Sequence, residues 1–205
     1  MTYCVAVRLK AGLVFLSDSR TNAGVDHIST FRKMTVFELP GERVMVLLSS
    51  GNLAITQAVV NRLSAQRRAG EASVWNAASM FNAAHAIGEA VREVHRTDAE
   101  ALRNFHIEFN ANFLFGGQIR GEPPRLFSIY AAGNYIEAAD ESPCFQIGEL
   151  KYGKPILDRV ITPDTTLDEA AKCALVSMDS TLRSNISVGM PLDLLVYEAD
   201  ALRVT

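Results

Sequence analysis

Basic residues are not in excess in this sequence. Lysine and arginine together number 20 and aspartate and glutamate 23, which leaves a formal net charge of -3. Binding to a phosphate backbone or to an anionic membrane depends on concentrated positive charge. Nucleic acid and membrane surfaces are therefore disfavoured as main partners.

Cysteine is also scarce, with three residues in a chain of 205. Cys4, Cys144 and Cys173 are odd in number and far apart, which fits reduced thiols in a cytoplasm better than a disulfide framework. Neither the cysteines nor the four histidines follow metal-ligand spacing. The histidines are His27, His85, His95 and His106. We expect no bound metal.

Long hydrophobic runs are missing as well. No apolar run approaches the roughly 18 residues of a membrane span, and the N-terminus lacks the basic start and apolar stretch of a secretory signal. The sequence also has no phosphate-binding loop, no dinucleotide-binding fingerprint and no G-x-S-x-G turn. We expect a soluble cytoplasmic protein without a cofactor.

The length and the 48% of hydrophobic residues suffice for one well-buried core, so we expect a single domain over residues 1–205. Alternating apolar residues predict a strand over residues 3–9, and an apolar run predicts a second over residues 13–16. A polar loop with Asn22, Gly24 and Asp26 should lead to an extended segment over residues 31–37. A buried strand over residues 42–51 should follow.

Helical periodicity appears next. One helix should start after Asn52 and stop at Gly70, and a longer one should start at Ser73. Strands are then expected over residues 106–116 and 126–130, and helices over 152–160 and after Thr166, where Glu169 completes a capping box. A strand over residues 193–198 closes the chain. The order of strands, two helices, strands, two helices and strand predicts an α+β layered domain.

Thr2 is the strongest candidate for catalysis. Removal of Met1 would leave a hydroxyl and a free α-amine on the same residue, which is a nucleophile with its own base. A terminal amine with an ordinary pKa of about 7.7 to 8.0 suits neutral pH better than a lysine does. The alternative is an ordinary residue at the start of a strand. The hairpin should bring Asp18 near Thr2, and Lys33 should point from a neighbouring strand, either as a plain salt bridge or as a pair that sets the electrostatics around Thr2.

These residues form an ordered set that resembles a known family. Thr2 at the terminus, Asp18 in an SDSRT segment and Lys33 after a loop are similar to the active-site run of proteasome beta-subunits, the N-terminal-nucleophile threonine hydrolases. The TYC start and the segment over residues 147–157 most resemble its bacterial ancestral beta-subunits, called Anbu. The resemblance implies a four-layer αββα sandwich of two antiparallel sheets flanked by helices. It also implies a homo-oligomer, either a ring or an open helical assembly.

The resemblance extends to further site residues. It implies that the Gly51 amide donates to an oxyanion and that Ser187 supports the threonine. Arg20 and Thr21 would frame the substrate channel, and Phe31, Ser49 and Leu53 would line a pocket for an apolar side chain, although core packing explains Phe31 and Leu53 equally well. Two positions depart from the family pattern: Ser184 replaces an aspartate, and Glu149 follows Gly148 where a serine is expected.

Two functions from different classes follow. The first is a threonine-type peptidase, isopeptidase or amidase that acts on a peptide or protein substrate inside its own assembly. The second is a catalytically idle scaffold or peptide-binding assembly protein, which Ser184 and Glu149 favour. The sequence selects no particular substrate and no unfoldase partner.

Overall fold

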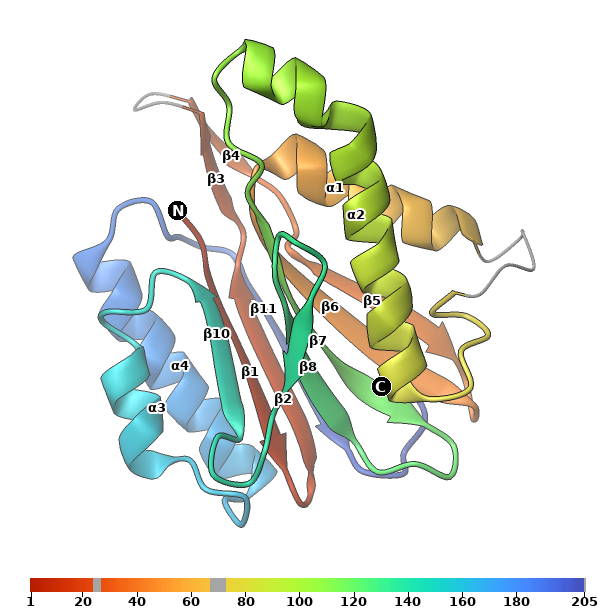
Figure 1. Ribbon diagram of the computed structural model, residues 1–205. Helices are drawn as coiled ribbons and strands as arrows, with labels where there is room; N and C mark the ends of the chain where they lie inside the picture. Colours follow the sequence, from red (N-terminus) through yellow and green to blue (C-terminus); the bar gives the residue numbers. More distant parts are fainter. Residues whose placement is uncertain (24–26, 67–72, 205) are drawn as a thin grey trace.

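The computed structural model describes residues 1–23, 27–66 and 73–204 (Figure 1). The strands are β1 (Tyr3–Leu9), β2 (Gly12–Asp18), β3 (Arg20–Ala23), β4 (His27–Thr30), β5 (Met34–Leu39), β6 (Arg43–Gly51), β7 (Ala111–Ile119), β8 (Arg125–Ile129), β9 (Tyr135–Glu137), β10 (Cys144–Gly148) and β11 (Leu192–Glu198). The helices are α1 (Leu53–Ala65), α2 (Met80–Asn104), α3 (Lys154–Val160) and α4 (Leu167–Ser184).

Two antiparallel sheets form the centre of the molecule. The first has the order β10-β1-β2-β11 and the second the order β5-β6-β7-β8-β9. Helices α3 and α4 cover the outer face of the first sheet, and α1 and α2 cover the outer face of the second (Figure 1). The expected four-layer αββα sandwich is therefore confirmed.

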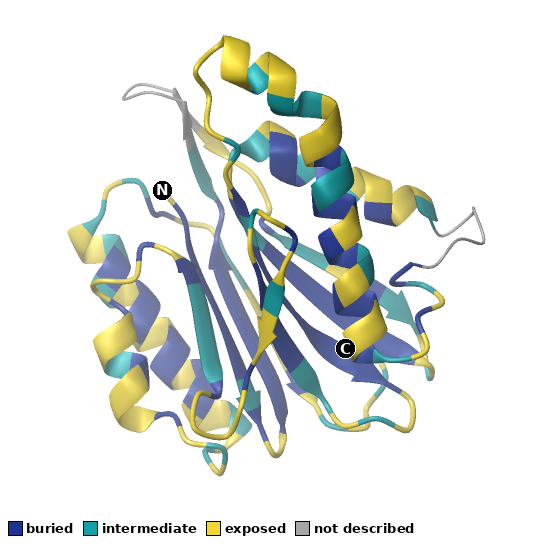
Figure 2. Ribbon diagram, viewed as in Figure 1, coloured by how far each residue is buried: buried dark blue, intermediate teal, exposed yellow. Residues whose placement is uncertain are grey.

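The alternation in β1 separates two cores. Tyr3, Val5 and Val7 pack with α3 and α4. Cys4 and Ala6 point the other way and pack between the two sheets. Because both faces of β1 and β2 are covered, nearly all of their residues are buried (Figure 2). This double burial fixes the register of the strands, since a slip by one residue would exchange the two faces.

Several element boundaries differ from the sequence expectation. Helix α1 ends at Ala65 rather than at Gly70, which lies outside the described residues. The longer helix begins at Met80, after Ser79 as N-cap, because the side chain of Asn76 accepts hydrogen bonds from Ser73 and holds that segment in a turn. The capping box of α4 at Thr166 and Glu169 is confirmed.

Three other predicted segments also differ from the structure. The segment expected as a polar loop around Asn22 contains a short ladder, in which β3 pairs with β4; Gly24 and Asp26 lie outside the described residues. Strand β5 begins at Met34 rather than at residue 31, and β7 begins at Ala111 rather than at residue 106. Within the described chain, no helix is long and apolar enough to cross a membrane.

Candidate active site

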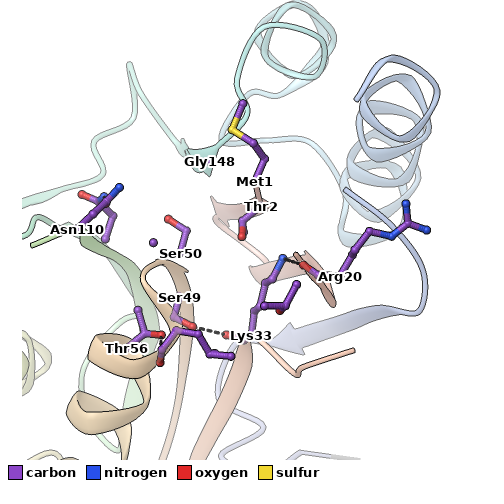
Figure 3. A pocket seen from close by; sticks show the side chains of 13 residues that line it. Met1, Thr2, Arg20, Lys33, Ser49, Ser50, Thr56, Asn110 and Gly148 are labelled. Atoms are coloured by element: carbon purple, nitrogen blue, oxygen red, sulfur yellow. Dashed lines mark hydrogen bonds between the residues drawn. The ribbon is translucent and has the colours of Figure 1, made fainter. Parts of the chain in front are cut away.

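A cavity of about 450 Å³ opens where several elements end together. It lies at the start of β1, at the end of β6 and at the start of β7 and α1 (Figure 3). Its lining residues are Met1, Thr2, Arg20, Thr21, Lys33, Ser49, Ser50, Gly51, Leu53, Thr56, Asn110, Asn112 and Gly148. Most of the residues expected at the site therefore meet in one place.

Thr2 lies immediately before β1 and is 9% exposed. Its carbonyl oxygen accepts a hydrogen bond from the amide of Glu149 at 2.7 Å, which ties it to the strand beside it. Among the described residues, neither its hydroxyl nor its own amide has a hydrogen-bond partner. Figure 3 shows the hydroxyl pointing into the cavity, toward the tip of Lys33.

Asp18 is the fully buried last residue of β2 and joins four segments. One carboxylate oxygen accepts from the Tyr3 amide at 3.0 Å and from Lys33 Nζ at 2.6 Å. The other accepts from the amides of Arg20, at 3.2 Å, and Gly189, at 3.3 Å. A carboxylate with this many donors is held in one position. The expected proximity of Asp18 and Lys33 is thus seen in the structure.

Lys33 precedes β5, and its side chain is 7% exposed. Besides Asp18, its ammonium group donates to the carbonyl oxygen of Arg20 at 2.8 Å. The nearby Cys4 thiol is influenced by the charges of both Asp18 and Lys33. Burial raises the pKa of Cys4, the Asp18 carboxylate raises it further, and the Lys33 ammonium opposes both. The hydrogen bonds of Lys33 therefore fix its positive charge at the floor of the cavity, and the Asp18 carboxylate lies behind it as the counter-ion.

Gly51 ends β6 with φ at +114°, a conformation that favours glycine. A β-carbon there would lie 2.3 Å from the carbonyl oxygen of Asn110. Helix α1 starts directly afterwards, with the Asn52 side chain accepting from the amide of Ala54 as N-cap. The cavity is thus bordered by the N-terminal end of a helix, where amide groups and the helix dipole favour negative charge.

The residues expected to contact substrate divide into two groups. Arg20, Thr21, Ser49 and Leu53 line the main cavity. Phe31 does not. It lines a neighbouring cavity of about 320 Å³, and this cavity shares Ser49 and Thr56 with the main one.

Ser187, a predicted catalytic residue, is not among the residues that line the cavity. It is in the turn after α4, where its amide donates to the side-chain oxygen of Asn185 at 2.9 Å. Four other lining residues were not anticipated: Ser50, Thr56, Asn110 and Asn112. Asn112 is the strand partner of Ser50, so only the register between β6 and β7 reveals the two asparagines.

Met1 also lines the cavity and is 64% exposed. It occupies the position from which a free Thr2 amine would act (Figure 3). For metal ions, the described residues contain no cluster of three or more His, Cys, Asp or Glu side chains that could hold one. Thr2, Lys33 and Asp18 are groups in or directly beneath the cavity that are capable of acid–base or nucleophilic chemistry.

The fold and this site together define a class. A two-sheet αββα sandwich with a threonine at the start of a central strand, an Asp–Lys pair beneath it and a glycine at a strand-to-helix turn is a proteasome beta-subunit-like architecture of the N-terminal-nucleophile type.

Comparisons with known proteins agree with this classification. The family model described as proteasome subunit matches residues 2–196. A mutant form of Anbu from Hyphomicrobium sp. strain MC1 is 56% identical with a TM-score of 0.93, covering 100% of this chain and 85% of that one. Anbu from Yersinia bercovieri is also 56% identical, with a TM-score of 0.93 and coverages of 98% and 84%.

A solved structure described as the helical assembly of the Anbu complex from Pseudomonas aeruginosa is 54% identical. Its TM-score is 0.94, and the match covers 98% of this chain and 83% of that one. The comparison with curated proteins found no match. The chain belongs to the proteasome subunit family and, within it, to the ancestral beta-subunits called Anbu.

Proposed function

We propose that the protein is a threonine-type N-terminal-nucleophile hydrolase that cleaves amide bonds. Once Met1 is removed, the α-amine of Thr2 takes the proton of the Thr2 hydroxyl, directly or through water. The Thr2 oxygen then attacks the substrate carbonyl carbon. The amide C–N bond breaks, the leaving amine takes the proton, and water hydrolyses the remaining ester to release the acid and restore Thr2.

The observation that carries this proposal is the convergence of three groups on one cavity: the Lys33 ammonium, the Gly51 backbone and the Thr2 hydroxyl, which has no hydrogen-bond partner in the described part of the chain. Lys33 supplies a positive potential beside the nucleophile and is fixed by Asp18 at 2.6 Å. The Gly51 amide, with the start of α1 behind it, is suited to stabilise the oxyanion. Loss of such a donor typically costs about 3 to 4 kcal/mol of transition-state stabilisation.

The proposed substrate is a peptide or protein that presents an apolar side chain beside the cleaved bond. The cavity next to the nucleophile, lined by Phe31, Met34 and Val60 among others, can receive that side chain. Arg20 and Thr21, on β3, would frame the approach. The chemistry needs no cofactor.

We propose a homo-oligomer, in a ring or an open helical arrangement, as the working form. The helical assembly formed by the Pseudomonas aeruginosa relative supports this. Large apolar side chains are also exposed in the segment that follows the C-terminal end of α4, where Ile186 is 83% and Met190 62% exposed. The cytoplasm is the proposed location, because all three cysteines are free thiols.

A second candidate function depends on whether Met1 is removed. While Met1 precedes Thr2, the amine needed as the base is part of a peptide bond, and the protein would be an idle scaffold that binds peptides or assembles. Ser184 and Glu149, which depart from the family pattern, also favour this candidate.

Intact mass before and after incubation with a threonine-reactive epoxyketone tests the proposal. An enzyme should show a mass without Met1 and one adduct that maps to Thr2. The Thr2→Ser variant should still react, because it keeps a hydroxyl and an amine, whereas Thr2→Ala should not. A trimmed terminus that never forms an adduct would contradict the enzyme, and a retained Met1 would favour the scaffold.

A further inference from the structure

Glu149 is a buried acid that the proposed reaction does not use. It is 7% exposed and follows β10, between the first sheet and the start of α3. Its carboxylate accepts from the Lys151 amide at 3.2 Å and from the Asn185 side chain at 3.0 Å. No basic side chain in the described part of the chain lies within 4.0 Å of it. A buried carboxylate without a cation is costly, so its environment is incomplete.

The backbone places Glu149 beside Thr2. Tyr3 pairs with Gly148 in the ladder between β1 and β10, so Thr2 stands opposite Glu149, and the Glu149 amide donates to the Thr2 carbonyl oxygen at 2.7 Å. Gly148 makes this close approach possible. A β-carbon on it would lie 1.9 Å from that same oxygen, and its φ is +93°. Residues that face each other in an antiparallel pair have β-carbons about 4.5–5.5 Å apart.

A cation is also available in the mature form. The Thr2 amide has no hydrogen-bond partner among the described residues, and hydrolysis of the Met1–Thr2 peptide bond would turn it into an ammonium group. The Glu149 carboxylate, which lacks a cation, and the Thr2 nitrogen, which would become one, thus belong to residues that face each other.

We propose that the Glu149 carboxylate receives the α-ammonium group of Thr2 once Met1 has been removed. Glu149 is a positioning residue for the base, and Asn185 and the Lys151 amide hold its carboxylate in place. The inference rests on the proposed function, because it concerns the base of that reaction. The glutamate that departs from the family pattern is then a working part of the site.

The other charged groups nearby are already engaged. Asp18 on β2 pairs with Lys33, Arg20 on β3 donates to the carbonyl oxygen of Ile186, and Arg183 on α4 pairs with Asp179. The side chain of Lys151, before α3, is exposed. The Thr2 amine would thus lie between two opposing influences. Glu149 favours its charged form, and Lys33 favours its neutral form.

The experiment measures the pH at which the Thr2 amine titrates, independently of turnover. Protein that starts at Thr2 is prepared by cleaving a ubiquitin-like fusion partner directly before this residue. The pH dependence of its labelling by acetic anhydride is followed by mass spectrometry of the N-terminal peptide. Glu149→Gln removes the charge and should move the labelling midpoint to lower pH by about 1 unit, a tenfold change in free amine at a given pH.

Two variants make the comparison specific. Glu149→Asp keeps the charge but withdraws it by one methylene, so its midpoint should fall by less. Glu141→Gln removes an exposed acid that precedes the opposite end of β10 and should leave the midpoint unchanged. If Glu149→Gln does not fold, Glu149→Asp decides the question.

A native midpoint in whichever Glu149 variant folds would overturn the proposal and leave Glu149 a merely structural group. The result is separable from the proposed function. A shifted midpoint in a protein that never reacts with an epoxyketone would support the Glu149 contact and contradict the enzyme. An unmoved midpoint in a protein that does react with the epoxyketone would contradict the Glu149 contact and support the enzyme.

Discussion

The Asp18–Lys33 pair should show strong energetic coupling, because both charges are buried: their side chains are 0% and 7% exposed. Removing one member of such a pair leaves an uncompensated charge and typically costs 3–5 kcal/mol. In Lys33→Met, the Asp18 carboxylate keeps three backbone amide donors at 3.0–3.3 Å, so we expect a loss of about 3 kcal/mol.

Asp18→Asn should cost slightly more, about 4 kcal/mol. The amide group of asparagine would face the Arg20 and Gly189 amides as a second donor, and the Lys33 ammonium would keep only the Arg20 carbonyl as a strong acceptor. The double variant buries no net charge and should lose about 4 kcal/mol, far less than the two single losses together. The coupling is therefore about 3 kcal/mol.

Urea unfolding of the four proteins, followed by circular dichroism, measures this double-mutant cycle. The exposed Lys172–Asp168 pair on α4 is a matched control, because it has a similar separation of 2.6 Å but side chains that are 71% and 75% exposed. Its coupling should vanish within error, since solvent screens it. Additive losses at Asp18 and Lys33, within about 0.5 kcal/mol, would refute the reasoning.

Three further predictions concern the site and its surroundings. Gly148→Ala should destabilise the protein by about 2 kcal/mol more than Gly121→Ala and suppress epoxyketone labelling of Thr2; both glycines have positive φ, but only at Gly148 would a β-carbon collide, and equal urea midpoints would disprove the clash. Phe31→Ala should lower kcat/KM roughly tenfold for substrates with a large apolar side chain and little for small ones, and a uniform change would remove Phe31 from specificity. Burial raises the pKa of Cys144 to about 12, so in the native protein its alkylation by iodoacetamide at pH 8 should be far slower than in urea, whereas equal rates would mean that this thiol is not shielded.

Local patterns predicted the sequence of elements well. The alternation of residues 3–9 and the capping box at Thr166 each specify an element within a few residues, and the structure confirms both. The errors lie where a local pattern competes with a specific contact. The turn at Ser73, closed by the Asn76 side chain, replaced an expected first turn of helix, and the pairing of β3 with β4 replaced an expected loop around Asn22.

The candidate site shows the same division. Thr2, Asp18 and Lys33 were identifiable from the sequence, because a hydroxyl at a terminus, a carboxylate and an ammonium form an ordered set in one short run. Asn110 and Asn112 were not, because their place at the cavity depends on the register of β7 against β6. The surroundings of Glu149 were not identifiable from the sequence either, because Asn185 reaches its carboxylate from the C-terminal end of α4, 36 positions further along the chain.

The sequence by itself thus determined the order of the elements, the αββα class through its resemblance to a family, and the candidate site residues near the N-terminus. Propensity, periodicity and capping act over a few residues, so a single chain displays them directly. Only the tertiary structure decided which groups meet around Thr2. Those contacts depend on strand register and on helix packing between residues far apart in the sequence, as in the hydrogen bond from the Gly189 amide to Asp18, two residues that are 171 positions apart.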